Sequence, residues 1–177
     1  MDSEPRDEES LWRDRASEGD PIALGHIYDA YAQRIYRYLY RRSGDAALAE
    51  DLTADVFLRL VEASGTPSFC QGSLAPWLYR LAHNRLVDHF RRHRELPLPD
   101  DYDQPSDDEE PTGIHRGELR AALRQLTPDQ QQVVALKFLE GLTNTQIAAA
   151  LSKPEGAVKS LQHRALDALR RLLEADR

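Results

Sequence analysis

The chain is acidic: its 177 residues carry 30 Asp and Glu against 23 Lys and Arg, a formal net charge of −7. Because basic surfaces bind the nucleic-acid backbone, this total taken alone argues against a nucleic-acid partner. The single cysteine, Cys70, excludes an intramolecular disulfide and fits a reducing compartment. The acidic N-terminus is not a secretory signal, and no apolar run reaches the length of about 18 residues expected of a membrane span.

The charge is distributed unevenly along the chain. Residues 1–20 hold 8 acids and 3 bases, and residues 96–113 hold 7 acids and no base, whereas residues 65–95 and 114–177 each carry a net charge of +3 (5 bases against 2 acids, and 10 against 7). The segment 96–113 also has four prolines and few large apolar residues, so burial cannot offset the entropy of ordering it. This pattern predicts two domains, 21–95 and 114–177, with a flexible acidic tail before the first and a flexible acidic linker between them.

The first domain shows helical periodicity only. Apolar residues recur at steps of three and four in residues 21–42, 46–62 and 75–92, which predicts three amphipathic helices in a small bundle. Pro21 suits a first-turn position and Asp45 suits an N-cap. Within residues 1–20, a short helix remains an open possibility, since Leu11, Trp12 and Ala16 follow the same spacing.

The third of these helices is unusually basic. It carries five arginines between Trp77 and Arg94 against one acid, Asp88. Arginines beside aromatic rings can neutralise phosphates and stack on bases, although an ordinary solvated helix face is the alternative. Trp77 itself lies among leucines, and we expect it in the core.

Two T-x-x-Q capping boxes mark helix starts in residues 114–177. The box at 127–130, with Pro128 at the first helical position, begins a helix that ends before Gly141. The box at 143–146 begins a second, shorter helix.

After the second box the pattern predicts a helix-turn-helix, with an ordinary helical hairpin as the alternative. The small side chain of Ala148 lets the two helices approach closely, and Ser152 stands where such turns often use glycine to reach a positive φ. The apolar residues expected to pack the pair together are Ile147, Ala148, Leu151, Val158 and Leu161. The residues expected to face a DNA groove, with charges and amides suited to phosphates and base edges, are Lys159, Ser160, Gln162, His163 and Arg164.

The two halves together resemble a bacterial sigma factor of the extracytoplasmic-function group. AEDLTADVFLRL and WLYRLAHNRLVDHFRR are similar to conserved regions 2.1–2.2 and 2.3–2.4, and the segment from LRQLTPDQQQ to LDALRRL is similar to region 4. The resemblance implies an all-α fold of two small helical domains, the second containing the helix-turn-helix. It also implies a cytoplasmic protein that binds core RNA polymerase, recognises the −35 and −10 promoter elements and assists DNA melting.

The resemblance further implies which residues make these contacts. Docking on the clamp helices of the β′ subunit falls to Asp51, Asp55, Phe57 and Leu58. Contacts to the −10 element fall to Phe69 in the loop 64–73 and to Arg80, Asn84, Arg85, Asp88, Arg91 and Arg92. Asn84 matches the family position near a flipped base, whose edge an amide can pair with. The groove-facing residues of the helix-turn-helix would read the −35 element, beside the β flap of the polymerase.

The same residues bear on a regulatory partner, on catalysis and metal binding, and on two rival functions. The family resemblance implies a separate anti-sigma factor as a regulator. The sequence lacks a phosphate-binding glycine loop and a Ser-His-Asp signature, so we expect no enzyme and no cofactor. His89 and His93 have metal-ligand spacing, but the surrounding arginines oppose a cation. Two rival functions remain: a free-standing helix-turn-helix regulator, which would bind DNA without polymerase, and an interaction adaptor, which leaves the basic helix unexplained.

Overall fold

The structure is a computed structural model that describes residues 5–93 and 116–175. Within these ranges every regular element is a helix, as the all-α prediction requires. The chain separates into two compact units, one within residues 1–104 and one within 105–177, and we describe each by itself. The expected linker at 96–113 lies outside the described residues. None of the described helices combines the length and apolar character needed to cross a bilayer.

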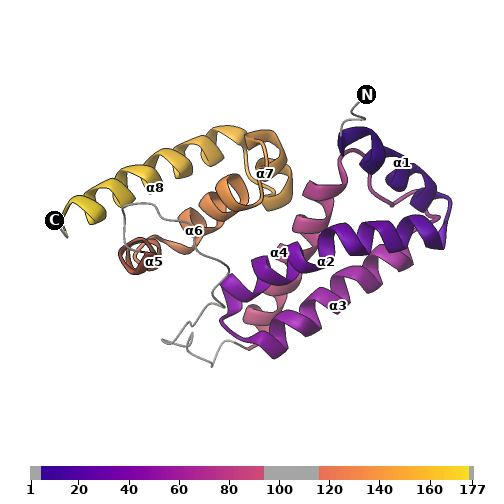
Figure 1. Ribbon diagram of the computed structural model, residues 1–177, viewed down its shortest axis with the longest axis horizontal. Helices are drawn as coiled ribbons and strands as arrows, with labels where there is room; N and C mark the ends of the chain where they lie inside the picture. Colours follow the sequence, from indigo (N-terminus) through magenta and orange to yellow (C-terminus); the bar gives the residue numbers. More distant parts are fainter. Residues whose placement is uncertain (1–4, 94–115, 176–177) are drawn as a thin grey trace. The chain divides into compact units, whose positions relative to one another are not determined.

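Unit 1 contains four helices (Figure 1): α1 (Pro5–Ser17), α2 (Pro21–Ser43), α3 (Ala46–Ala63) and α4 (Leu74–Arg92). The last three confirm the predicted helices to within one residue at either end. Helices α2 and α3 lie side by side, and α4 packs against both of them.

The caps of these helices follow the sequence signals. The Asp20 side chain accepts a hydrogen bond from the Ile22 amide at 2.9 Å, and the Asp45 side chain accepts one from the Leu48 amide at 3.1 Å. Between them, Gly44 ends α2 in the left-handed region at φ 68°. A glycine reaches that conformation without a Cβ clash, so the chain reverses directly from α2 into α3.

The core of unit 1 is a set of aliphatic side chains around two tyrosines. The rings of Tyr38 and Tyr79 meet edge to face, with centroids 5.4 Å apart and planes at 85°. Such pairs add about 0.5–1.5 kcal/mol beyond the burial of their area. The largest fully buried aliphatic side chains of the unit are Ile27, Ile35, Leu39, Leu60, Leu74, Leu78 and Leu86.

Helix α1 corrects the expectation that residues 1–20 form a flexible tail. Ala16 is completely buried, and the Trp12 ring stacks on His26 with centroids 5.5 Å apart. The Tyr31 hydroxyl donates a hydrogen bond to Glu9 Oε2 at 2.9 Å. The short helix that the spacing of Trp12 and Ala16 left open is thus confirmed, and the packing of α1 on α2 supplies the partners of its side chains.

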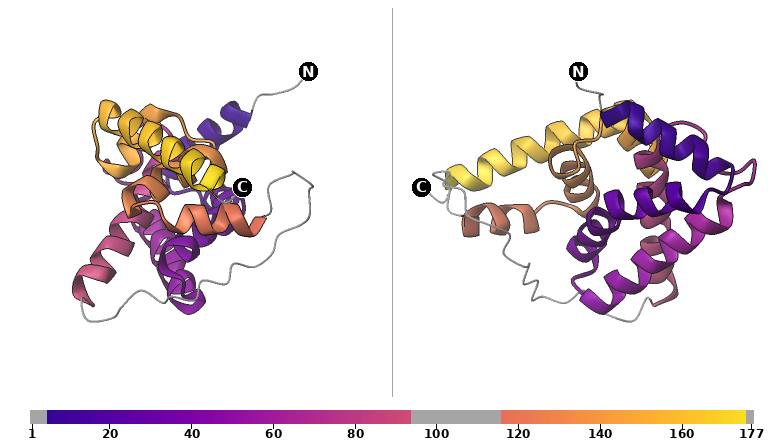
Figure 2. Two further views of the ribbon diagram at one scale, coloured as in Figure 1. Left: turned by 90° about the vertical axis from the view of Figure 1, so that its left-hand side faces the viewer. Right: turned by 45° about the vertical axis from the view of Figure 1, so that its right-hand side comes forward.

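Unit 2 is arranged along its longest helix. Its elements are α5 (Arg116–Arg124), α6 (Pro128–Val134), the π-helical turn η1 (Ala135–Leu139), α7 (Asn144–Leu151) and α8 (Glu155–Ala175). Helix α8 contacts α5, α6 and α7, which Figures 1 and 2 show beside it. The core between α5, α6 and α8 consists of Ala122, Leu126, Val134, Ala165 and Leu169.

Both capping boxes of unit 2 form as predicted. The amide of Gln130 donates to Thr127 Oγ1 at 3.4 Å, and the amide of Thr127 donates to Gln130 Oε1 at 3.0 Å. The Thr143 and Gln146 pair repeats this exchange at 3.2 and 2.9 Å. The helix from Pro128 widens to π geometry in its last turn before the chain turns at Gly141, where φ is +69°.

The helix-turn-helix forms from α7 and α8, with one correction. Ile147, Leu151 and Val158 are buried as expected, but the small residue fully buried on α7 is Ala150, while Ala148 is half-exposed. Positions 147, 150 and 151 share one helix face, whereas position 148 lies about 100° around the helix from Ile147.

The turn between the two helices carries a strained residue. Ser152 has φ 53° and ψ 41°, and among the described residues it alone has a positive φ without being glycine. The amide of the next residue, Lys153, donates to the Ala148 carbonyl at 3.0 Å, which closes the end of α7. Serine therefore occupies the position at which glycine was expected, in the conformation that glycine prefers.

Replacing Ser152 should stabilise unit 2. We expect Ser152→Gly to raise its free energy of unfolding by about 0.5 kcal/mol, because relief of the left-handed strain exceeds the entropy added to the unfolded chain. Urea denaturation followed by circular dichroism measures the change. The matched control is Ser160→Gly, which places glycine inside α8 and should lower the same free energy by about 0.5–1 kcal/mol. A loss in both variants would show that Ser152 is not strained.

Candidate nucleic-acid interface

The exposed side of α4 carries most of the predicted −10 residues. Arg80, Asn84, Arg91 and Arg92 are exposed to solvent, and Asp88 is half-buried. Residues 80, 84, 88 and 91 follow one another at steps of four and three, which places them along one helix face. The Asn84 amide is therefore accessible from solvent on this face. Asp88 accepts a hydrogen bond from Arg91 Nη2 at 3.1 Å and orients that guanidinium.

Arg85 lies apart from this row and pairs with another helix. Its Nε is 2.9 Å from Asp55 Oδ2 on α3, and both side chains are about one-third exposed or less, at 26% and 34%. An ion pair this accessible to water contributes at most about 1 kcal/mol. The two residues were expected in different interfaces, one on DNA and one on polymerase. The structure brings them together as a bridge between α3 and α4.

The residues expected to dock on polymerase separate into surface and core. Asp51 is exposed and the Leu58 side chain is 55% exposed, whereas Phe57 is only 6% exposed. The Phe57 ring meets Tyr28 edge to face, with centroids 4.9 Å apart. In this structure Phe57 therefore belongs to the core, and its expected contact with polymerase remains a prediction. Sequence reasoning missed Val61, which is 54% exposed three residues after Leu58 and extends the same apolar surface.

The loop 64–73 is largely exposed and buries two residues near its middle, Phe69 and Cys70. Residues 65–68 are exposed, but Phe69 is only 4% exposed and its ring lies 5.5 Å from the Trp77 ring. In this structure the Phe69 ring is enclosed by the protein, and its expected contact with DNA remains a prediction. Trp77 is half-buried, so it forms the wall between loop and core instead of lying inside the core.

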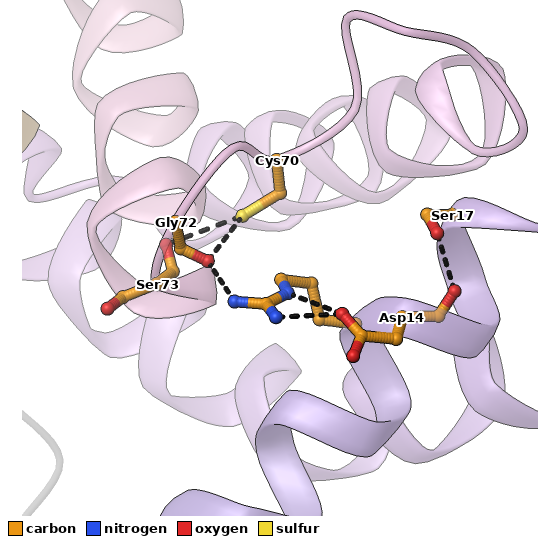
Figure 3. A network of polar contacts seen from close by, with 6 residues as sticks. Asp14, Ser17, Cys70, Gly72 and Ser73 are labelled. Atoms are coloured by element: carbon orange, nitrogen blue, oxygen red, sulfur yellow. Dashed lines mark hydrogen bonds and ion pairs between the residues drawn. The ribbon is translucent and has the colours of Figure 1, made fainter.

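Polar contacts fix the end of this loop, as Figure 3 shows. The Cys70 thiol donates weak hydrogen bonds to the carbonyls of Gly72 and Ser73, at 3.6 and 3.4 Å. From α1, Arg13 Nη1 donates to the same Gly72 carbonyl at 2.7 Å. Burial raises the pKa of the Cys70 thiol to about 11. Cys70 is thus a structural residue of the loop, protonated at neutral pH.

The recognition helix α8 exposes four of its five predicted contact residues: Lys159, Ser160, His163 and Arg164. Gln162 is half-buried, and its Nε2 donates to Asn144 Oδ1 at 2.6 Å. This bond ties the recognition helix to the first turn of α7. In this structure the Gln162 amide therefore links the two helices, and its expected contact with a base edge remains a prediction.

Acidic residues on α8 accompany the exposed bases. Lys159 Nζ lies 2.9 Å from Glu155 Oε1, and His163 Nε2 lies 3.4 Å from Asp167 Oδ2, each one helical turn apart. The hydrogen bond and charge of Lys159 lower the pKa of Glu155, and a hydrogen bond from Thr145 acts in the same direction. Exposed ion pairs such as these are weak, so they hold the two basic side chains only loosely.

The described residues hold no group of three or more side chains arranged to bind a metal ion. His89 and His93 stack on each other with ring centroids 4.2 Å apart. Desolvation lowers the pKa of His89, and the neighbouring His93 lowers it further.

Comparison with known families matches each unit to a conserved region of one family. The family model for sigma-70 region 2 matches residues 27–95, and the model for sigma-70 region 4 matches residues 116–169. The match to region 2 begins inside α2 and includes α3, the loop and α4, while the match to region 4 includes the helix-turn-helix.

Curated relatives agree along most of the chain. The extracytoplasmic-function sigma factor BldN of Streptomyces coelicolor is 37% identical over 171 residues, which cover 92% of this chain and 65% of that protein. The present chain therefore spans slightly less than two-thirds of BldN. The extracytoplasmic-function sigma factor SigL of Mycobacterium tuberculosis is 30% identical over 90% of this chain and 93% of its own length. Among solved structures, the sigma factor RpoE of Bartonella quintana, in complex with the anti-sigma factor NepR, matches with a TM-score of 0.65 and 25% identity, over 86% of this chain and 98% of that one.

The burial of Cys70 leads to a chemical prediction. Because the pKa of its thiol is about 11 instead of the ordinary value of 9.0, the thiolate fraction near neutral pH is about 100-fold smaller than for a free cysteine. We expect iodoacetamide to modify the folded protein at least about 100-fold more slowly than a cysteine-containing peptide, and at the peptide's rate in urea. Mass spectrometry measures the rate unambiguously, since Cys70 is the single cysteine. Rapid modification of the folded protein would contradict the buried position.

Proposed function

The chain belongs to the extracytoplasmic-function group of RNA polymerase sigma factors, and we propose that it binds core RNA polymerase, recognises −35 and −10 promoter elements and assists DNA melting. The observation that supports this most directly is the presence of region 2 and region 4, in that order, on two separate helical units of one chain. In this proposal the protein is a cytoplasmic initiation factor without an enzymatic activity of its own, because RNA synthesis is the chemistry of its polymerase partner.

Unit 1 is proposed to act on the −10 element. Arg80, Arg91 and Arg92 supply positive charge for phosphates, and Asn84 supplies an amide for a base that has left the stack. Asp88 holds Arg91 in place, and Asp55 holds Arg85, so the two carboxylates act by positioning arginine side chains of α4. Asp88 is thus the acid within the otherwise basic face of α4, whereas Asp55 reaches Arg85 from α3.

A second proposed role of unit 1 is to bind polymerase through α3. Asp51 and Leu58 are exposed there, and Val61 enlarges the apolar part of the surface. An acidic and apolar helix face suits a partner with a complementary basic and apolar surface, as expected for the β′ clamp helices.

Unit 2 is proposed to read the −35 element with the first half of α8. Lys159 and Arg164 are placed to contact phosphates or guanine, and Ser160 and His163 lie between them. The hydrogen bond between Gln162 and Asn144 keeps α7 and α8 in register while this surface contacts the groove. The same unit is proposed to touch the β flap.

The proposed domain limits are a region 2-like domain at 21–95 and a region 4-like domain at 114–177, preceded by residues 1–20 and joined by the acidic segment 96–113. The 18 residues of the linker reach at most about 60 Å when extended. Promoter elements about 17 base pairs apart lie about 58 Å apart along the DNA. The linker permits this separation without fixing it, so the polymerase must hold the two domains in place.

An anti-sigma factor is proposed as a further partner. The related RpoE was solved in complex with the anti-sigma factor NepR. A protein that covers the exposed face of α3 would compete with core polymerase for Asp51, Leu58 and Val61.

Transcription with purified components tests the proposal. Core RNA polymerase with this protein is expected to initiate at specific sites on genomic fragments, while core alone and this protein alone give no initiation. Gel-shift measurements should show weak binding of the isolated protein to duplex DNA. Initiation no higher than with core alone would overturn the proposal, and tight promoter binding without polymerase would favour a free-standing helix-turn-helix regulator.

Asn84→Ala should impair promoter opening more than polymerase binding. The amide meets the strand only after melting, so we expect about a tenfold lower yield of open complex, since a lost base contact costs about 1–3 kcal/mol. Permanganate reactivity of unpaired thymines measures opening, and fluorescence titration measures affinity for core polymerase. Gln33→Ala is the matched control, because it removes an exposed amide from α2. An equal loss of opening and of polymerase affinity would contradict the role of Asn84.

A further inference from the structure

Helix α1 has no part in the function proposed above. It ends at Ser17, ten residues before the region 2 match begins at residue 27. The helix is nevertheless built into unit 1 by buried Ala16, by the stack of Trp12 on His26 and by the hydrogen bond between Glu9 and Tyr31. Such anchoring indicates that α1 supports a neighbouring segment.

The segment in question is the junction between the loop 64–73 and α4. Ser73 is the N-cap of α4, but its side chain makes no capping hydrogen bond. Gly72 has φ +111°, a conformation that serves a sharp turn and that L side chains rarely adopt. The local sequence therefore does not secure this junction by the usual cap.

A hydrogen bond from α1 and contacts made by other residues of the loop secure the junction instead. The Gly72 carbonyl accepts hydrogen bonds from Arg13 Nη1 at 2.7 Å and from the Cys70 thiol at 3.6 Å. Arg13 comes from a position 59 residues earlier in the chain, and its charged donor makes the stronger bond of the two. On the other side of the loop, the ring of Phe69 lies against Trp77.

The Arg13 guanidinium is itself held in position. Asp14 Oδ1 accepts from Nε at 3.0 Å and from Nη2 at 2.7 Å, which leaves Nη1 directed at the loop. The Arg13 side chain is only 28% exposed. One turn later, buried Ala16 fixes the helix that carries it. The arrangement is a fixed donor aimed at one backbone carbonyl.

We propose that α1 is a brace for the loop 64–73 and that Arg13 is a positioning residue for promoter recognition. By holding the Gly72 carbonyl, Arg13 sets where the exposed loop residues 65–68 and the start of α4 meet the −10 strand. This inference rests on the proposed function of that surface. Loss of the brace alters base preference at the −10 element and leaves polymerase affinity intact, because Asp51 and Leu58 lie on α3.

Hydrogen exchange on the free protein tests the brace without polymerase. Arg13→Ala is expected to speed amide exchange in residues 69–74 by about tenfold, as loss of a charge-assisted hydrogen bond requires. Arg15→Ala is the matched control: it removes the same charge from the same helix, but Arg15 pairs with Asp20 and not with the loop. Equal exchange of the loop in both variants overturns the brace.

Promoter selection tests the positioning role. With core polymerase and templates randomised at the −10 element, Arg13→Ala is expected to lower discrimination between preferred and other bases by about tenfold, with −35 preference and core affinity unchanged. Arg13→Lys should recover part of the discrimination, because a lysine retains the charge and one donor. If Arg13→Ala fails to fold by circular dichroism, Arg13→Lys carries the test, with a smaller loss expected. Discrimination equal to that of Arg15→Ala overturns the positioning role.

Failure of the proposed function and failure of the inference about α1 give different results. If the unaltered protein initiates at no promoter, the proposed function fails, while hydrogen exchange still decides whether α1 braces the loop. If the unaltered protein initiates and Arg13→Ala keeps the same base preference, the function stands and this inference fails.

Discussion

Burial of one stripe on each helix is the constraint on which the rest of the structure depends. In α2 this stripe includes Ile27, Ile35 and Leu39, all inaccessible to solvent. Once it is packed against α3 and α4, the outward face of each of those helices is fixed by the helical repeat of 3.6 residues. On α4 the face left exposed carries Arg80, Asn84, Asp88 and Arg91, and on α3 it carries Asp51, Leu58 and Val61. These residues face solvent because the opposite face of each helix is buried in the core.

Several acidic residues in and just after α1 make contacts inside unit 1. Glu9 accepts from the Tyr31 hydroxyl, and burial together with the Glu9 charge raises the pKa of Tyr31. Asp14 orients Arg13, and Asp20 caps α2 and pairs with Arg15. The backbone hydrogen bond from Ile22 lowers the pKa of Asp20. Several acids of the N-terminal segment therefore serve unit 1 internally, and the net charge alone is a poor guide to its partners.

Polar side chains in this protein often act on one another before they act on a partner. Asp55 bridges to Arg85 and Gln162 bridges to Asn144, each between two helices that carry surface residues of the proposed interfaces. Such bonds hold exposed neighbours, such as Asn84 on α4 and Lys159 on α8, in defined positions. Pre-organised donors lose less entropy on binding than mobile ones, so under the proposed function the bridges would support recognition without touching DNA.

The sequence by itself determined the local features: the amphipathic helices, Pro21 in the first turn of α2, the cap at Asp45, both T-x-x-Q boxes and the left-handed position at Ser152. Each depends on residues close together in the chain. Tertiary structure alone decided the burial of Phe69, the exposure of Ala148 and the engagement of the Gln162 amide. It also decided the reach of Arg13 to Gly72. These depend on which helices meet, and helical periodicity gives the face of a residue but not the group that another element places opposite it.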